Sequence, residues 1–124
     1  MLVVKNKTIR AASAVAVLLG GLVLPLAASA AEGANALDEG KKIAFDRAAG
    51  NCLACHAIKG GESPGNIGPP LMDMQKRFKD KAALRAQIWD PMVRNPLTTM
   101  PPFGRNQILT EQQLDKVTDF IWTL

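Results

Sequence analysis

Both cysteines and the only histidine of this 124-residue chain lie within five consecutive positions, Cys52-Leu53-Ala54-Cys55-His56. On a turn of helix, side chains three or four residues apart lie on the same face. The two thiols and the imidazole would therefore project together from one side of the backbone. The side chains best suited to bind a cofactor are concentrated at this point, and the fold must be organised around it.

The pattern C-x-x-C-H is typical of covalent haem attachment. Each cysteine adds to a vinyl group of the porphyrin as a thioether, and the adjacent histidine becomes the proximal ligand of the iron. We therefore predict that Cys52 and Cys55 hold one haem c and that His56 binds its iron.

Three other interpretations fit this motif less well. A thioredoxin-like redox pair requires a βαβ context, and no alternation typical of a strand lies near Cys52. A structural zinc site requires four good ligands, whereas the chain offers two cysteines and one histidine. A disulfide between Cys52 and Cys55 would close a loop too small to constrain the unfolded chain much, and it would leave His56 without a role.

Residues 1–30 have the three parts of a secretory signal peptide. Three bases precede an apolar stretch over residues 11–24, and the small residues Ala28-Ser29-Ala30 then form an A-x-A cleavage site. We expect cleavage after Ala30. Residues 31–124 would then be the mature cytochrome c domain, located in the periplasm.

A membrane anchor is the alternative role of that apolar stretch. It contains a serine and two glycines, stops at Pro25, and is shorter than the roughly 20 apolar residues that a spanning helix requires. No cysteine follows the cleavage site and no Arg-Arg pair precedes the stretch, so neither lipid attachment nor twin-arginine export is indicated. We therefore expect no stable membrane anchor.

The positive net charge comes mostly from the signal segment. The chain has 15 Lys and Arg against 11 Asp and Glu, a formal net charge of +4. Three of the bases and none of the acids precede residue 31, which leaves 12 bases against 11 acids, or about +1, in the mature part. Because this part has no cluster of bases with interleaved aromatic residues, nucleic acid is not an expected partner.

The mature chain is short and makes one domain. Domains of this size bury a limited fraction of their surface and commonly need a disulfide, a metal or a cofactor for stability. We predict that the covalent haem forms the centre of the core and that the chain without it is poorly folded.

The apolar periodicity predicts an all-α domain of about four helices. The haem motif is shared by c-type cytochromes, and this resemblance implies a small cytochrome c-like fold in which the helices wrap around the haem. Asn35 and Asp80 are candidate N-caps, and Thr110 with Gln113 has the spacing of a capping box. The last helix should pack on the first. The predicted helices cover residues 35–49, 71–78, 81–89 and 110–124.

A loop rich in glycine and proline, residues 59–70, follows the haem motif. An iron-bound histidine normally donates its second ring N–H to a carboxylate or a backbone carbonyl, which fixes the orientation of the ring. The segment Gly68-Pro69-Pro70-Leu71 resembles the G-P-x-L element of class I cytochromes c, in which the proline carbonyl accepts this bond. The resemblance implies that the Pro69 carbonyl accepts from His56.

A second loop, residues 95–104, carries the candidate for the sixth iron ligand. The thioether of methionine suits a low-spin electron-transfer haem and raises its reduction potential. Met72 and Met74 fall in a predicted helix, where methionine usually fills the core, and Met92 directly follows a helix end. Met100 precedes two prolines, whose restricted backbone would hold its side chain in place. We predict that Met100 is the ligand.

Five basic residues lie close together in the middle of the chain. They are Lys76, Arg77, Lys79, Lys81 and Arg85. Such a group is usually a solvated face, and it can also meet an acidic partner. The sequence leaves both roles open.

Together with the haem motif, the stretches PGNIGPPL over 64–71 and MPPFG over 100–104 resemble the SoxX family. Its members are the small monohaem cytochrome c subunits of the thiosulfate-oxidising SoxAX complex. The match covers nearly all of the mature chain. The resemblance implies a periplasmic heterodimer with a SoxA-type cytochrome. This complex joins thiosulfate to a cysteine of the carrier SoxYZ and releases two electrons, the reaction of an L-cysteine S-thiosulfotransferase.

That reaction needs a cysteine thiolate, whereas both cysteines of this chain would be consumed as thioethers. We therefore expect no catalytic residue here and place the catalytic thiol on the SoxA subunit. This chain would accept electrons from the haem of that subunit and pass them to a small cytochrome c. The alternatives are a diffusible periplasmic cytochrome c that shuttles electrons and, in another class, a haem sensor with an open sixth site.

Overall fold

The computed structural model describes residues 26–124, and it describes side chains from residue 33 onward. The predicted signal peptide therefore lies outside the described residues except for the backbone of Leu26–Ala30, and its cleavage site stays a prediction. Among the helices of the described part, none combines the length and the apolar character that crossing a bilayer requires.

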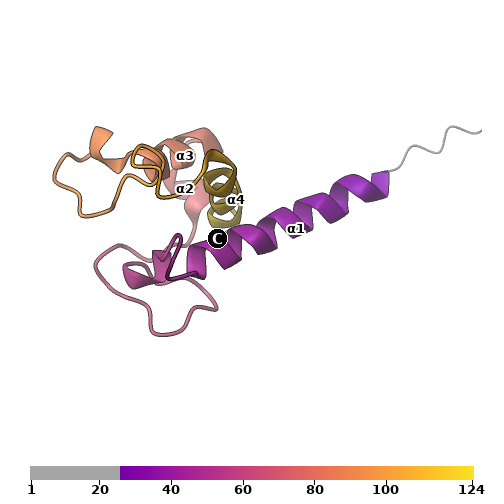
Figure 1. The fold of residues 1–124 in the computed structure, drawn as a ribbon, viewed down its shortest axis with the longest axis horizontal. Coiled ribbons are helices and arrows are strands. Elements are labelled where there is room, and N and C mark those ends of the chain that lie inside the picture. The colour runs from indigo at the N-terminus through magenta and orange to yellow at the C-terminus, as the bar shows by residue number, and fades with distance from the viewer. Residues whose placement is uncertain (1–25) are drawn as a thin grey trace, which may run out of the picture.

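The described part is helical, and the prediction of an all-α domain is confirmed. Two loops, residues 55–70 and 94–104, project to the side of the molecule away from the start of α1 (Figure 1). An isolated parallel β-bridge joins Ile58 to Leu71. The α-helices and short 3-10 helices are, in chain order, α1 (Leu26–Phe45), η1 (Cys52–Ala54), α2 (Met74–Arg77), α3 (Lys81–Trp89), η2 (Pro91–Val93) and α4 (Glu111–Trp122).

Helices α1 and α4 cross and pack against each other, as predicted. Gly40 faces the backbone carbonyl of Lys116 so closely that a Cβ at this position would collide with it. Beside the crossing, the rings of Phe45 and Phe120 meet edge to face, with centroids 6.1 Å apart and an interplanar angle of 79°. Lys116 also pairs with Glu39, and its ammonium group lowers the pKa of that carboxyl.

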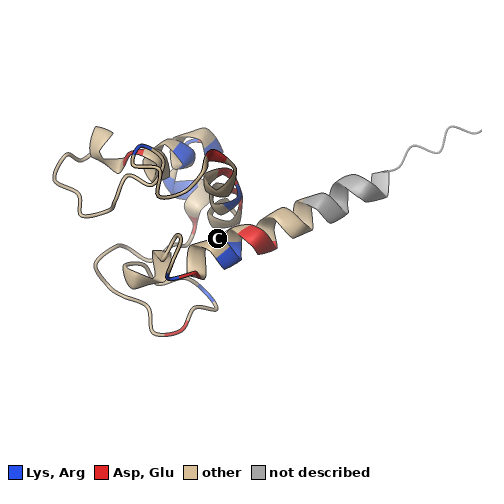
Figure 2. Ribbon diagram, in the orientation of Figure 1, with Lys and Arg blue, Asp and Glu red and all other residues tan. Residues whose placement is uncertain are grey.

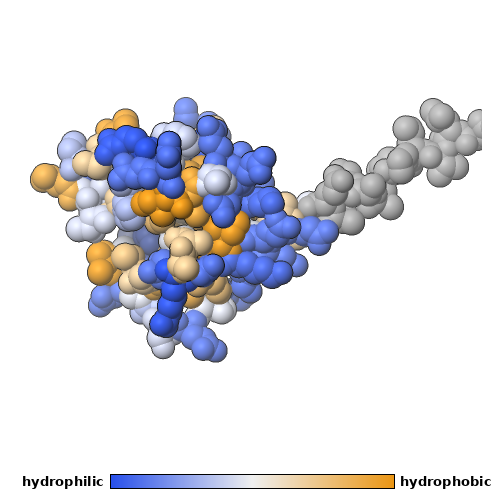
Figure 3. Space-filling model, in the orientation of Figure 1, coloured by the Kyte–Doolittle hydropathy of each residue, from blue (hydrophilic) through white to orange (hydrophobic). Residues whose placement is uncertain are grey.

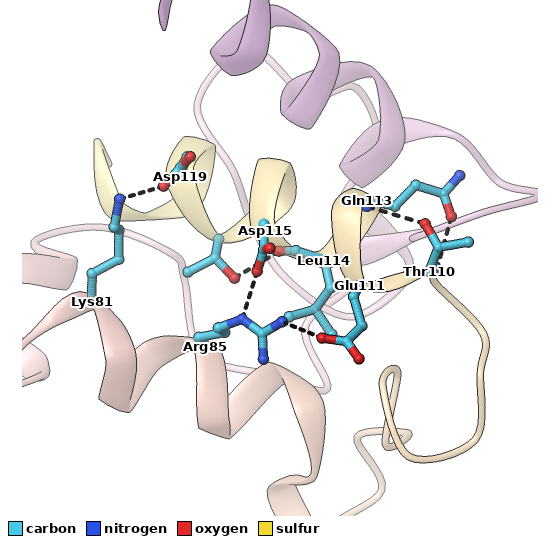
Figure 4. Close-up of polar contacts among 9 residues, drawn as sticks. Lys81, Arg85, Thr110, Glu111, Gln113, Leu114, Asp115 and Asp119 are labelled. Atoms are coloured by element: carbon cyan, nitrogen blue, oxygen red, sulfur yellow. Dashed lines mark hydrogen bonds and ion pairs between the residues drawn. The ribbon is translucent and has the colours of Figure 1, made fainter.

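The predicted capping box at the start of α4 is present. The Thr110 hydroxyl accepts from the backbone N–H of Gln113 at 3.2 Å, and the Gln113 side chain accepts from the N–H of Thr110 at 3.0 Å (Figure 4). Four apolar side chains then follow at helical spacing and are buried in the core. They are Leu114, Val117, Phe120 and Ile121. Each such burial stabilises the fold by about 1.5–3 kcal/mol.

Helix α3 begins as predicted, because the Asp80 carboxylate accepts from the N–H of Ala83 at 2.7 Å. Ion pairs join it to α4. Lys81 lies 2.6 Å from Asp119, and Arg85 contacts Asp115 at 2.5 Å (Figure 4). Much of the positive charge of the predicted basic surface is thus paired with neighbouring carboxylates. The surface therefore does not offer an acidic partner a uniformly positive patch.

The first helix differs from the prediction at both ends. Asn35 lies inside α1 and is not its N-cap. The helix ends at Phe45 because Asp46 forms a turn instead: its carbonyl accepts from Ala49, and its carboxylate accepts from Ala48 at 2.8 Å.

The helix predicted over 71–78 is also shorter than expected. Leu71 pairs with Ile58 in the β-bridge, and Asp73 has a left-handed backbone with φ 52°, so α2 begins only at Met74. The two prolines before Leu71 hold the chain extended, which favours the bridge over an earlier helix start. The N–H of Met74 then donates to the carbonyl of Leu124 at 3.0 Å and ties α2 to the chain end.

Candidate haem site

A cavity of about 930 Å³ opens between the haem-motif segment and the second loop. Figure 3 shows apolar residues gathered in the hollowed middle of this face. Its volume falls within the roughly 300–1,000 Å³ typical of cofactor and ligand sites. Much of its wall is the hydrophobic core itself: Met74, Leu84, Ile88, Phe103, Leu109, Val117 and Ile121.

The haem-attachment motif forms one side of this cavity. Cys52, Cys55 and His56 all line it. The thiols are not joined in a disulfide. The motif adopts a 3-10 turn, in which the Cys52 carbonyl accepts from the N–H groups of Cys55 at 3.2 Å and His56 at 2.9 Å. Asn51 precedes it with a left-handed backbone, φ 47°.

Burial raises the pKa of the Cys52 thiol to about 11. The thiol therefore stays protonated at neutral pH in the protein without haem. A protonated thiol is a poor nucleophile. This environment does not suit a catalytic cysteine, whereas an apolar pocket suits attachment of a flat cofactor.

The imidazole of His56 is oriented by a backbone carbonyl. Its Nδ1 lies 2.7 Å from the carbonyl oxygen of Pro69. Because a carbonyl can only accept, Nδ1 carries the proton and Nε2 keeps its lone pair, which can bind iron. Gly68 lies against the ring so closely that a Cβ there would collide with it. Glycine is therefore required beside this histidine.

Backbone hydrogen bonds hold the 59–70 loop against the motif. Gly65 donates to Leu53 at 2.8 Å, and Gly68 donates to Cys55 at 2.8 Å. A Cβ on Gly65 would collide with the Ala54 carbonyl. The two glycines thus let the loop approach closely enough to bring Pro69 to the imidazole.

The structure separates the four candidate methionines into two pairs. Met74 and Met100 line the cavity, whereas Met72 and Met92 are absent from its described lining. Met74 is almost fully buried in the core, and its sulfur lies 3.4 Å from the Arg77 guanidinium. Met100 is partly buried on the loop, and its N–H donates to the Thr98 hydroxyl at 3.2 Å.

Three arginines line the cavity and were missed as site residues in the sequence. They are Arg47, Arg77 and Arg94, and no carboxylate occurs in the described lining. Arg77 donates to the Pro70 carbonyl at 2.7 Å, and Arg94 lies over the ring of Phe78. Guanidinium groups suit the two carboxylates that a haem carries. No pattern around these arginines distinguishes them from the bases on the surface.

The site therefore has an apolar wall, two thiols, an imidazole with a free Nε2 and a thioether. Residues 37–124 match the family model of cytochrome c. The chain belongs to the cytochrome c family. Covalently bound haem c is the cofactor of this family, and the residues that line the cavity fit it.

The chain is a SoxX-type member of that family, as its sequence stretches predicted. In the crystal structure of SoxXA from P. pantotrophus, one chain is 31% identical to it and superimposes with a TM-score of 0.63. This likeness covers 69% of the present chain and 79% of that one.

A curated relative is longer than the present chain. A protein described as an uncharacterized lipoprotein, from Aquifex aeolicus (strain VF5), is 30% identical over 76 residues. The match covers 58% of the present chain and 35% of the relative, so the chain spans about a third of that protein's length.

Proposed function

We propose that this chain is the electron-relay subunit of a SoxAX-type L-cysteine S-thiosulfotransferase. The observation that carries the proposal is the placement of Cys52, Cys55, His56 and Met100 around one cavity. A chain of SoxXA shares 31% identity and this fold. An electron-transfer cytochrome of this type needs a partner that supplies electrons and another that removes them.

The proposed roles of the residues follow from their chemistry. The sulfur atoms of Cys52 and Cys55 would hold the haem as thioethers, and His56 Nε2 and Met100 Sδ would be the two iron ligands. When bound, the haem supplies a one-electron centre whose potential a histidine–methionine pair raises. The Pro69 carbonyl fixes the imidazole ring, and the apolar core side chains exclude water from the site.

The chain has no cysteine left for the sulfur chemistry. Its only cysteines, Cys52 and Cys55, both lie in the cavity wall. Joining thiosulfate to a carrier cysteine forms a sulfur–sulfur bond, as the thiol loses a proton and the pair of reactants loses two electrons. The catalytic thiol would therefore belong to a SoxA-type partner, with SoxYZ as carrier. This chain would pass the electrons one at a time to a small cytochrome c in the periplasm.

Co-purification tests this proposal directly. The full chain is produced in its exported, haem-loaded form with an affinity tag, together with a SoxA-type cytochrome. We expect a stable heterodimer, and its haem should be reduced when thiosulfate and SoxYZ are added. Without SoxYZ, the same sample should stay oxidised.

Two other outcomes would point to the alternative functions. A clean monomer that exchanges electrons with other redox proteins would overturn the subunit role and indicate a diffusible carrier. Carbon monoxide binding to the reduced protein at neutral pH would indicate an open sixth site and a haem sensor, because a methionine-ligated iron resists this ligand.

A further inference from the structure

We propose that Asp90 is a positioning residue that fastens both ends of the loop bearing Met100. Asp90 follows the last residue of α3, and its side chain is only 11% exposed. Its Oδ1 accepts from the backbone N–H of Met92 at 3.1 Å, and its Oδ2 accepts from Arg105 Nη1 at 2.9 Å. The chain leaves this carboxylate at Met92 and returns to it at Arg105.

Arg105 completes the closure at the base of the loop. Its second guanidinium nitrogen, Nη2, lies 3.2 Å from the sulfur of Met92. Its backbone N–H and that of Gly104 donate to the Trp89 carbonyl at 3.2 and 3.1 Å. The Asp90 carboxylate and the Arg105 guanidinium therefore join three parts of the chain: the segment that enters the loop, the segment that leaves it and the end of α3.

The middle of the loop is held much less firmly. The hydrogen bonds that the structure shows for residues 95–101 all stay within residues 91–101, as in the bond from the Thr98 N–H to the Asn95 carbonyl at 3.0 Å. Leu97 at its tip is 92% exposed. No charged side chain occurs in residues 95–104, and in Figure 2 this loop is correspondingly tan. The charged groups that fix it stand at its base.

A loop held at its base positions its middle by limiting the conformations that the chain can adopt. This inference rests on the proposed role of Met100 as iron ligand. We call the contacts of the Asp90 carboxylate with Met92 and Arg105 the Asp90 clasp. Its loss should increase the fraction of molecules in which the methionine has left the iron. An added ligand that competes for the iron reports that fraction, because its apparent affinity scales with the population of the open state.

Imidazole titration of the ferric, haem-loaded protein tests the clasp. Asp90→Asn removes the charge that holds Arg105, and we expect imidazole to bind about tenfold more tightly, as follows from losing a charge-assisted hydrogen bond. Arg105→Gln removes the other partner from a half-exposed position and should act in the same direction. The double variant should bind imidazole about as tightly as each single variant, because the two substitutions remove the same ion pair.

Lys81→Gln is the matched control. It breaks an ion pair of α3 with α4 that does not involve the loop, so it should leave imidazole affinity unchanged. Denaturant unfolding of each variant then separates global stability from local opening. If Asp90→Asn and Arg105→Gln bind imidazole no more tightly than the control does, the proposed clasp is wrong. If Asp90→Asn does not fold, Arg105→Gln alone decides.

Met100→Ala separates failure of the clasp from failure of the ligand assignment. If Met100 binds the iron, this variant should bind imidazole more tightly than Asp90→Asn does. A response of Met100→Ala without a response of the two clasp variants would reject the clasp alone. No response of Met100→Ala would reject the ligand, and the clasp with it.

Discussion

His56 Nδ1 donates a 2.7 Å hydrogen bond to the carbonyl oxygen of Pro69, which lies 13 residues further along the chain. This bond fixes the plane of the imidazole and makes Nε2 the atom available to iron. It also gives the ring partial negative character, because the carbonyl draws on the Nδ1 proton. A more basic imidazole stabilises ferric iron relative to ferrous iron.

We predict that Gly68→Ala raises the reduction potential. The added Cβ collides with the imidazole and must push the loop or the ring away, which weakens the Pro69 bond. Loss of about 1.4 kcal/mol of preference for the ferric state corresponds to a rise of about 59 mV for a one-electron couple. Potentiometric titration followed in the visible spectrum measures the change.

Gly33→Ala is the control for that variant. Gly33 lies in α1, and a Cβ there would meet nothing within 4 Å. Its potential should equal that of the parent. If the reduction potential of Gly68→Ala equals that of the parent and of Gly33→Ala, the hydrogen bond from His56 to Pro69 does not influence the potential.

The helices could be predicted from the sequence where local signals agree with packing. Asp80 and the pair Thr110 and Gln113 cap their helices as expected, because these side chains satisfy free N–H groups a few residues away. The prediction that Asn35 caps the first helix was wrong, because α1 begins already at Leu26, in a stretch rich in alanine, which favours helix. A pairing between distant segments, such as the Ile58–Leu71 bridge, leaves no periodic trace in the sequence.

In the candidate site, too, local motifs could be predicted from the sequence, whereas contacts between distant segments could not. Contiguous residues such as Cys55 and His56 identify a haem motif by their spacing alone. Arg77 and Arg94 were missed because their place in the cavity wall depends on how α2 and the second loop fold back toward the motif. The Asp90 clasp likewise could not be predicted from the sequence. Its carboxylate contacts both Met92 and Arg105, and Arg105 reaches it only because the loop between them folds back.

We predict that the chain folds poorly when haem cannot be attached. The cavity wall contains much of the buried core, so without haem those side chains line a large void or meet water. In a Cys52→Ala, Cys55→Ala variant, far-ultraviolet circular dichroism should show markedly less helix than the haem-loaded parent. A compact helical spectrum with a cooperative thermal transition would contradict this prediction.

Met100→Ala should open the sixth coordination position. The reduced variant should then bind carbon monoxide at neutral pH, and the ferric variant should lose the weak long-wavelength absorption band of methionine-ligated haem. Met72→Ala is the matched control, because Met72 is 58% exposed and outside the described cavity lining. Absorption spectra of both variants decide the assignment.

A different outcome would move the assignment to another methionine. If Met100→Ala keeps the methionine-ligated spectrum while Met74→Ala loses it, the buried core methionine is the ligand. Loss of the spectrum in Met72→Ala or Met92→Ala would show that a residue outside the described lining reaches the iron.

Gly40→Ala should destabilise the crossing of α1 and α4. In an exposed helix interior, alanine is more favourable than glycine by about 0.5–1 kcal/mol, and Gly33→Ala should therefore not destabilise the protein. At Gly40 the added methyl group meets the Lys116 carbonyl, so the helices must separate at a typical cost of about 1–3 kcal/mol. Guanidinium unfolding of the two haem-loaded variants measures the difference. Equal midpoints would show that α1 and α4 do not approach each other as closely as this contact requires.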